Sequence, residues 1–128
     1  MNFFDYKPTD FVGLIPSDCV IYVVVILLII SNTFMTLAWY NHLKSPSRTF
    51  FMSLCIAMFY VIFEYTFNIH ANAIGYTKYD LYTLKVIQEA VTLSVFVAYA
   101  YLAYGEELTT KHGFAFGLVF AAVAIVSS

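Results

Sequence analysis

Charge is scarce in this chain. Only 11% of its 128 residues are Asp, Glu, Lys or Arg, against about 25% in an ordinary soluble domain. Hydrophobic residues make up 62%, so the chain lacks the polar surface that a water-soluble fold needs. The net charge of −2 offers none of the basic surface that nucleic-acid binding requires. The composition therefore predicts a membrane protein that does not bind nucleic acid.

Reactive and metal-binding residues are also few. The two cysteines, Cys19 and Cys55, lack the spacing of a redox or zinc motif, and we expect them to pack as small hydrophobic side chains. His42, His70 and His112 are far apart in the sequence and form no ligand set. There is no nucleophile–base pattern, Gly-rich phosphate loop or cofactor motif. The sequence predicts a non-catalytic protein with no metal and no cofactor.

Long apolar runs are what the chain has in abundance. There are four, covering about residues 18–40, 49–72, 84–104 and 108–128. Each has about the 20 residues that a helix needs to cross a ~30 Å hydrocarbon core. The fourth is the shortest, because its uninterrupted part extends only from Gly113 to Val126. The predicted fold is an all-α membrane protein, a four-transmembrane-helix bundle that forms one domain over residues 18–128.

The first 17 residues differ from the runs that follow. Pro8, Gly13 and Pro16 argue against a regular helix there. The aromatic residues of this segment suit the headgroup region of a bilayer. We therefore expect residues 1–17 to form an N-terminal extension at the membrane interface. The loops between the four runs are short, which favours antiparallel neighbours in an up-down arrangement.

Turn and capping residues mark the ends of the predicted helices. Pro46 breaks the first loop, and Ser47 is the predicted cap of the second helix. Asp80 or Thr83 is the predicted cap of the third helix. Gly105 is the predicted residue after its last turn, because a helix commonly ends at a glycine.

Two carboxylates interrupt the apolar runs, Glu64 in the second and Glu89 in the third. A charge inside a membrane costs at least ~2.5–3.5 kcal/mol on insertion scales, so it is retained where it is buried, paired or functional. Each of the first three runs carries one polar stripe at helical spacing, which lipid cannot satisfy and which should therefore face other helices. The stripes consist of Asn32, Thr36 and Trp39; Glu64, Asn68 and Asn72; and Lys85, Gln88, Glu89 and Thr92.

The positions of the charges along their helices predict a meeting point. Glu64 lies about 22 Å into a helix that begins near residue 49, and Lys85 and Glu89 lie within about 2–8 Å of the start of the next helix. We therefore expect Glu64, Lys85 and Glu89 to form a buried carboxylate–lysine–carboxylate cluster. Such a cluster either couples proton or cation movement to transport or pairs structurally and fixes helix register. The sequence supports both interpretations.

Small residues recur at every fourth position of the fourth run, at Gly113, Gly117 and Ala121. This spacing lets two helix backbones approach closely and is typical of helix pairing in lipid. The same spacing also serves packing inside one bundle. The pattern therefore predicts a helix-packing face, either within the chain or against another chain.

Four segments together resemble a known family: SNTFMTLAWYNHLK (31–44), FEYTFNIHANAIGY (63–76), LKVIQEAVTLSVF (84–96) and YGEELTTKHGFAFG (104–117). They resemble a small, functionally uncharacterised four-helix family placed in the drug/metabolite transporter superfamily. The resemblance implies a four-helix half-unit related to small multidrug resistance transporters, which work as dimers. Those transporters carry their coupling carboxylate in the first span, and residues 20–39 here contain no acid. Any coupling in this chain would therefore use Glu64 or Glu89.

Two functions follow from these features. The favoured one is an accessory or structural subunit of a larger membrane complex, because the first span lacks an acid and the N-terminal extension suits contact with a neighbour. Its expected location is an organellar energy-transducing membrane, the mitochondrial inner membrane. The alternative is a dimeric carrier of a small molecule or metabolite that uses Glu64 or Glu89 for coupling. The expected partners are the lipid bilayer and either other membrane subunits or a second copy of the chain.

Overall fold

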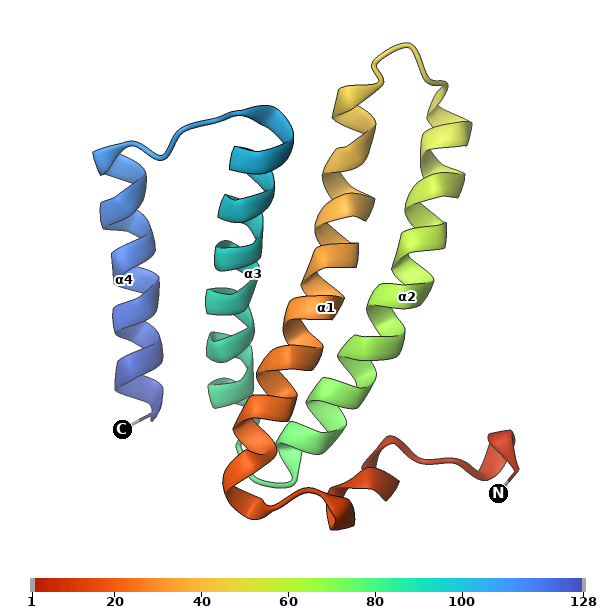
Figure 1. The fold of residues 1–128 in the computed structure, drawn as a ribbon, viewed down its shortest axis with the longest axis vertical. Coiled ribbons are helices and arrows are strands. Elements are labelled where there is room, and N and C mark those ends of the chain that lie inside the picture. Colours follow the sequence, from red (N-terminus) through yellow and green to blue (C-terminus); the bar gives the residue numbers. More distant parts are fainter. Residues whose placement is uncertain (1, 128) are drawn as a thin grey trace.

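The computed structural model describes residues 2–127, and the ordered elements in that range are all helical (Figure 1). The α-helices are α1 (Val20–Tyr40), α2 (Phe50–Tyr76), α3 (Leu81–Tyr104) and α4 (Thr110–Ser127). Short 3₁₀ turns precede α1 at Phe3–Asp5, Pro8–Leu14 and Ser17–Cys19, and another, Asn41–Lys44, follows it. The all-α class predicted from the sequence is confirmed.

Three of the helices, α1, α2 and α3, surround a shared core, and α4 lies beside α3. Figure 1 shows the order α4, α3, α1, α2 across the view, with α1 and α3 running in one direction and α2 and α4 in the other. α1 packs along both α2 and α3, whereas α4 packs along α3. The chain therefore alternates up and down as expected. α1 is the central helix of the three that share the core, and α4 lies at the edge, along α3.

Three helical segments are long and apolar enough to cross a membrane: Ser17–Lys44, Phe50–Tyr76 and Leu81–Tyr104. The fourth apolar helix, Thr110–Val126, is shorter. It begins later than residue 108, because Leu108 and Thr109 belong to the loop. Its length is about 26 Å at about 1.5 Å per residue. α4 is therefore shorter than a ~30 Å hydrocarbon core, and three of the described helices have the full spanning length.

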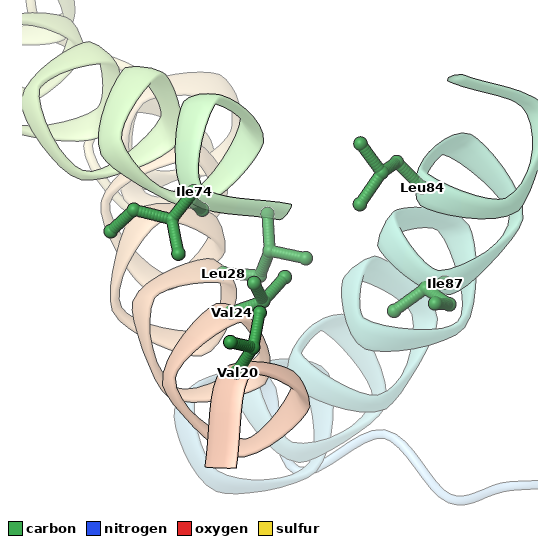
Figure 2. Close-up of a cluster of buried hydrophobic side chains, with 7 residues drawn as sticks. Val20, Val24, Leu28, Ile74, Leu84 and Ile87 are labelled. Atoms are coloured by element: carbon green, nitrogen blue, oxygen red, sulfur yellow. The ribbon is translucent and has the colours of Figure 1, made fainter. Parts of the chain in front are cut away.

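The apolar core lies between α1, α2 and α3, near the start of α1 (Figure 2). Its buried side chains are Val20, Val24 and Leu28 from α1, Ala71 and Ile74 from α2, and Leu84 and Ile87 from α3. Gly75 of α2 marks the closest approach of these helices. A Cβ atom at that position would lie 2.6 Å from Cδ2 of Leu84 and 3.3 Å from Cγ2 of Val24. The tight contact of α2 with both neighbours therefore depends on a glycine at this position.

The N-terminal extension packs against α2 of its own chain. The turn Pro8–Leu14 contacts α2, and Tyr6 forms a hydrogen bond of 2.7 Å between its hydroxyl and Nε2 of His70. Nδ1 of His70 lies 2.6 Å from the backbone oxygen of Thr66, and a carbonyl can only accept, so Nδ1 is the donor of this hydrogen bond. The Lys78 ammonium donates to the backbone oxygen of Ser17 at 2.8 Å.

The helix ends follow local capping chemistry. Asp80 caps α3, as predicted, by accepting a hydrogen bond of 2.9 Å from the backbone N–H of Thr83. Hydrogen bonds from the side chain and backbone of Thr83 hold the pKa of Asp80 below its usual value. Gly105 ends α3 with a left-handed φ of 66°, also as predicted. The cap of α2 is Thr49, which accepts from the N–H of Met52, so the prediction of Ser47 is wrong.

Candidate functional site

Two adjacent polar residues in the middle of α1 link it to both neighbouring helices. Ser31 and Asn32 are 0% and 1% exposed. Ser31 Oγ donates a shared hydrogen bond to the backbone oxygen of Glu64 on α2 at 3.1 Å and to its Oε1 at 3.3 Å. On the other side, Thr92 Oγ1 of α3 donates to Asn32 Oδ1 at 2.6 Å. Together Ser31, Asn32, Glu64 and Thr92 form a polar layer at mid-depth.

Glu64 lies farther from the end of its helix than the sequence suggested. α2 continues to Tyr76, so Glu64 lies about 18 Å from that end, whereas Lys85 lies about 6 Å from the start of α3. The two side chains are therefore at different depths. In the structure of residues 2–127, Glu64 is bonded to Ser31 and Lys85 to Glu89. The predicted cluster of Glu64 with Lys85 and Glu89 is wrong.

Lys85 and Glu89 form an ion pair one helical turn apart on α3. Lys85 Nζ lies 2.7 Å from Glu89 Oε1, and the two side chains are 67% and 50% exposed. Glu89 lies about 12 Å from the start of α3, which places it inside the hydrocarbon core. An ion pair at that depth needs water, a ligand or another protein around it, because lipid cannot solvate it.

The remaining polar residues of the stripes fall into two groups. Thr36 is buried and donates to the backbone oxygen of Asn32 at 2.7 Å, and Gln88 is half-buried on the face of α3 that is directed to α1. Asn68 and Asn72 bond to each other along α2, with 2.8 Å between Nδ2 and Oδ1. The structure therefore brings the stripes of α1 and α3 together and leaves the end of the α2 stripe on its own helix.

A cavity of about 400 Å³ lies between α1 and α3; we call it the α1–α3 cavity. Its polar lining consists of Thr36, Lys85, Gln88, Glu89 and Thr92, and its apolar lining of Met35, Trp39, Tyr40, Leu93 and Phe96. Small-molecule sites are clefts of about 300–1,000 Å³ with apolar and aromatic walls and a few polar groups. The α1–α3 cavity has the volume and the lining of such a site.

Two smaller cavities continue along α3 toward the loop before α4. One, of about 170 Å³, is lined by Tyr40, Leu43, Phe96, Tyr99, Ala100, Tyr104 and Glu106. The other, of about 220 Å³, includes Phe96, Tyr101, Glu106, Glu107 and His112 in its lining. Phe96 borders all three cavities. The three cavities therefore follow α3 from Lys85 to the loop at Glu106.

Sequence reasoning missed Phe96, Tyr99 and Glu106 as parts of this site. Phe96 lies on the same helical face as Glu89 and Thr92, but an aromatic residue in an apolar run gives no polar signal. The hydroxyl of Tyr99 is buried with no hydrogen-bond partner among the described residues. Extending the polar stripe of α3 by helical spacing is the signal that could have found Phe96 and Tyr99.

The small residues of α4 face away from the rest of the chain. A Cβ atom at Gly113 or Gly117 would have no neighbouring atom within 4 Å, and Ala121 is exposed. α4 contacts the core cluster through Val123 instead. The small-residue face of α4, defined as Gly113, Gly117 and Ala121, therefore serves no packing within the described part of the chain.

The groups along α3 combine polar side chains with aromatic walls. Across residues 2–127, no three His, Cys, Asp or Glu side chains come together as a metal-binding set. Cys19 and Cys55 are free and exposed. The α1–α3 cavity contains one ion pair, one amide, two threonine hydroxyls and three aromatic side chains. Such groups can bind a small polar solute.

Comparison with known proteins identifies the family. The family model described as "Putative member of DMT superfamily (DUF486)" matches residues 24–127. This range includes the mid-depth layer, the three cavities and α4. No curated protein and no solved structure matches the chain. The chain therefore belongs to the DUF486 family, placed in the DMT superfamily, and is an integral, multi-pass membrane protein.

Proposed function

We propose that the chain is the half-unit of a membrane carrier for small solutes. The observation that carries the proposal is the series of three cavities along α3, which share Phe96 and extend from the Lys85–Glu89 pair to Glu106. Secondary transporters bind their substrates near the middle of the membrane, at the interface between repeats. The α1–α3 cavity reaches that depth at Thr92, and membership of the DMT superfamily agrees with a carrier.

Glu89 is the carboxylate that such a carrier would use for coupling. It lines the α1–α3 cavity, and half of its side chain is exposed. Glu64 is only 8% exposed and accepts a hydrogen bond from Ser31. A coupling group must meet substrate or water during the cycle, which favours Glu89. Because α1 contains no acid, the mechanism would differ from that of the small multidrug resistance transporters.

A second copy of the chain would complete the carrier. The α1–α3 cavity is lined by α1 and α3 without described residues of α2 or α4, so two helices of one chain do not surround a pathway. Polar groups at membrane depth need walls on every side, because lipid satisfies none of them. Transporter folds obtain these walls by placing two repeats around one site. A homodimer that closes the cavities between two chains fits the carrier best.

Thiol labelling from each side of the membrane tests the carrier. In a chain with Cys19→Ala and Cys55→Ala, a reporter is placed in the cavity as Gln88→Cys. Ser94→Cys, on the exposed outer face of α3, is the matched control. In sealed proteoliposomes, a membrane-impermeant maleimide should reach Gln88→Cys from both sides and the lipid-facing Ser94→Cys from neither. Labelling of Gln88→Cys from one side alone would contradict the proposal.

A second candidate is an accessory subunit of a larger membrane complex. The observation that favours it is the outward small-residue face of α4, which has open space at Gly113 and Gly117. Such a face allows close contact with a helix of another protein. In this role, the host would be an energy-transducing membrane such as the mitochondrial inner membrane.

The native mass after extraction in mild detergent separates the two candidates. A dimer without other proteins supports the carrier. A much larger assembly with fixed partners supports the accessory subunit and gives the Lys85–Glu89 pair a structural role. Identification of the co-purifying proteins would then name the host complex and its membrane.

A further inference from the structure

The charges in the α1–α3 cavity come as a pair of opposite sign. Lys85 and Glu89 line the cavity 2.7 Å apart, next to the half-buried amide of Gln88 and the aromatic rings of Trp39 and Phe96. We propose that the cavity binds a small zwitterion with an apolar or aromatic body, its ammonium group on Glu89 and its carboxylate on Lys85. The assignment rests on the proposed carrier function and names the class of its substrate.

Net charge decides the class of ligand. The Lys85–Glu89 pair is neutral as a unit, and an uncompensated charge becomes costly once a ligand displaces water from the cavity. A zwitterion replaces the internal ion pair by two ion pairs to the ligand, so the site stays neutral when it is occupied. A simple cation on Glu89 would leave Lys85 uncompensated, and a simple anion on Lys85 would leave Glu89 uncompensated. The pair therefore selects against both.

The geometry of the pair limits the size of the zwitterion. Lys85 and Glu89 are one turn apart on the same helix, so the two charges of the ligand must also be close, as they are in an α-amino acid. The lysine stem is long and flexible, which lets the ammonium move aside and admit the ligand. Trp39, Tyr40 and Phe96 provide a wall for an apolar body.

A phosphoethanolamine headgroup carries the same zwitterionic chemistry as a free solute. Headgroups lie outside the ~30 Å hydrocarbon core. Glu89 lies about 12 Å from the start of α3, and the cavity reaches Thr36 and Thr92, which lie at or next to the mid-depth layer. The depth of the site favours a soluble zwitterion over a lipid headgroup.

Calorimetric titration of the full chain in phosphatidylglycerol nanodiscs tests the assignment. The probes are phenylalanine, phenethylamine (which lacks the carboxylate) and hydrocinnamate (which lacks the ammonium). We expect phenylalanine to bind at least about tenfold more tightly than either analogue, because each analogue leaves one charge of the Lys85–Glu89 pair without a partner in the occupied cavity. Lys85→Gln should shift the preference to phenethylamine and Glu89→Gln to hydrocinnamate. Lys111→Gln, an exposed lysine of α4, is the matched control and should preserve the ranking.

A charge swap keeps the test decisive where a single variant does not fold. Lys85→Glu combined with Glu89→Lys retains the ion pair and should restore the preference for phenylalanine. Three outcomes would overturn the assignment. They are equal affinity for the three probes, no binding of phenylalanine, and an unchanged ranking of probe affinities in single variants that fold. Loss of phenylalanine binding when phosphatidylethanolamine replaces phosphatidylglycerol would show that the lipid headgroup occupies the cavity. That outcome would also overturn the assignment to a soluble zwitterion. Two-sided labelling of Gln88→Cys needs no ligand, so the carrier can hold while the substrate class fails.

Discussion

α1 and α4 are both apolar helices, yet their situations in the fold are opposite. α1 buries seven residues, among them the polar Ser31, Asn32 and Thr36. None of the described side chains of α4, residues 110–126, is buried. α1 lies between α2 and α3, whereas α4 lies at the edge of the fold and packs along α3 (Figure 1). Apolar composition alone therefore does not tell which helix is central.

Hydrogen bonds and close packing explain the difference. Lipid tails are as apolar as leucine side chains, so hydrophobicity does not drive one membrane helix against another. α1 uses Ser31 and Asn32 to bond both of its neighbours at mid-depth. The glycines of α4 that would allow a close helix contact, Gly113 and Gly117, lie on the face directed away from the rest of the chain. The chain therefore fixes the position of α1 internally, and the outer face of α4 is left for lipid or another protein.

The largest expected loss of stability follows from Gly75→Ala. The added Cβ would lie 2.6 Å from Leu84 and 3.3 Å from Val24, so α2 must move away from its neighbours or those side chains must shift. We expect the free energy of unfolding to fall by about 1–3 kcal/mol, the usual cost of overpacking. Reversible unfolding in mixed micelles, followed by circular dichroism, measures the change.

Gly117→Ala is the matched variant on α4. Open space surrounds that position, so we expect no loss of monomer stability and a gain of up to about 1 kcal/mol from helix propensity. A loss as large as that of Gly75→Ala would contradict the outward orientation of this face. A fall in the dimer fraction with monomer stability unchanged would show that a second copy packs on the face.

The link between Asn32 and Thr92 should give the next largest effect. A double-mutant cycle with Asn32→Ala and Thr92→Ala should yield a coupling energy of about 0.6–1.7 kcal/mol, the range measured for hydrogen bonds between membrane helices. Thr33 bonds only to the carbonyl of Ile29 on its own helix. A cycle of Thr33→Ala with Thr92→Ala should therefore give no coupling, and equal coupling in both cycles would refute the mid-depth layer.

Local features of the fold could be predicted from the sequence. Asp80 and Gly105 mark the ends of α3 as expected, because capping depends on a few neighbouring residues. The polar stripes of α1 and α3 could also be identified, because which residues share a face depends only on helix periodicity. As expected, these stripes face each other, and Asn32 and Thr92 meet between the two helices. Glu64 was misplaced because α2 runs to Tyr76, past the predicted end at residue 72.

The site could be predicted only in part. Its charged and amide residues interrupt apolar runs, so Lys85, Gln88 and Glu89 could be identified from the sequence. Of its aromatic residues, Trp39 belongs to a predicted stripe, whereas Phe96 and Tyr99 carry no polar signal and can be found only by extending the stripe of α3 at helical spacing. Which helices enclose a cavity depends on tertiary packing, and the edge position of α4 follows from no local signal.

Glu89→Gln should change stability little and function greatly. In a carrier, water in the open cavity solvates the half-exposed Lys85–Glu89 pair. Water-exposed pairs contribute up to about 1 kcal/mol, so the loss of unfolding free energy should stay below about that value. Uptake of phenylalanine into proteoliposomes should be abolished, while assembly of the protein stays intact. A clear loss of bundle stability with uptake unchanged would instead assign the pair a structural role.

The smallest expected effect is a difference in acid sensitivity between the starts of α3 and α4. α3 begins with Asp80, whose pKa is lowered by hydrogen bonds from Thr83, whereas α4 begins after Thr109, a neutral residue that accepts from the N–H of His112. A pKa lower in the folded state means that Asp80 contributes stability above its unfolded pKa of about 3.9, and that this contribution is lost as the pH falls through the folded value. Asp80→Asn should flatten the fall in stability below about pH 4, and Thr109→Asn should not, as measured by acid titration of helicity in micelles. The same acid profile in Asp80→Asn and the unchanged chain would mean that the cap of α3 does not contribute through its charge, and the two helix starts would then be equivalent.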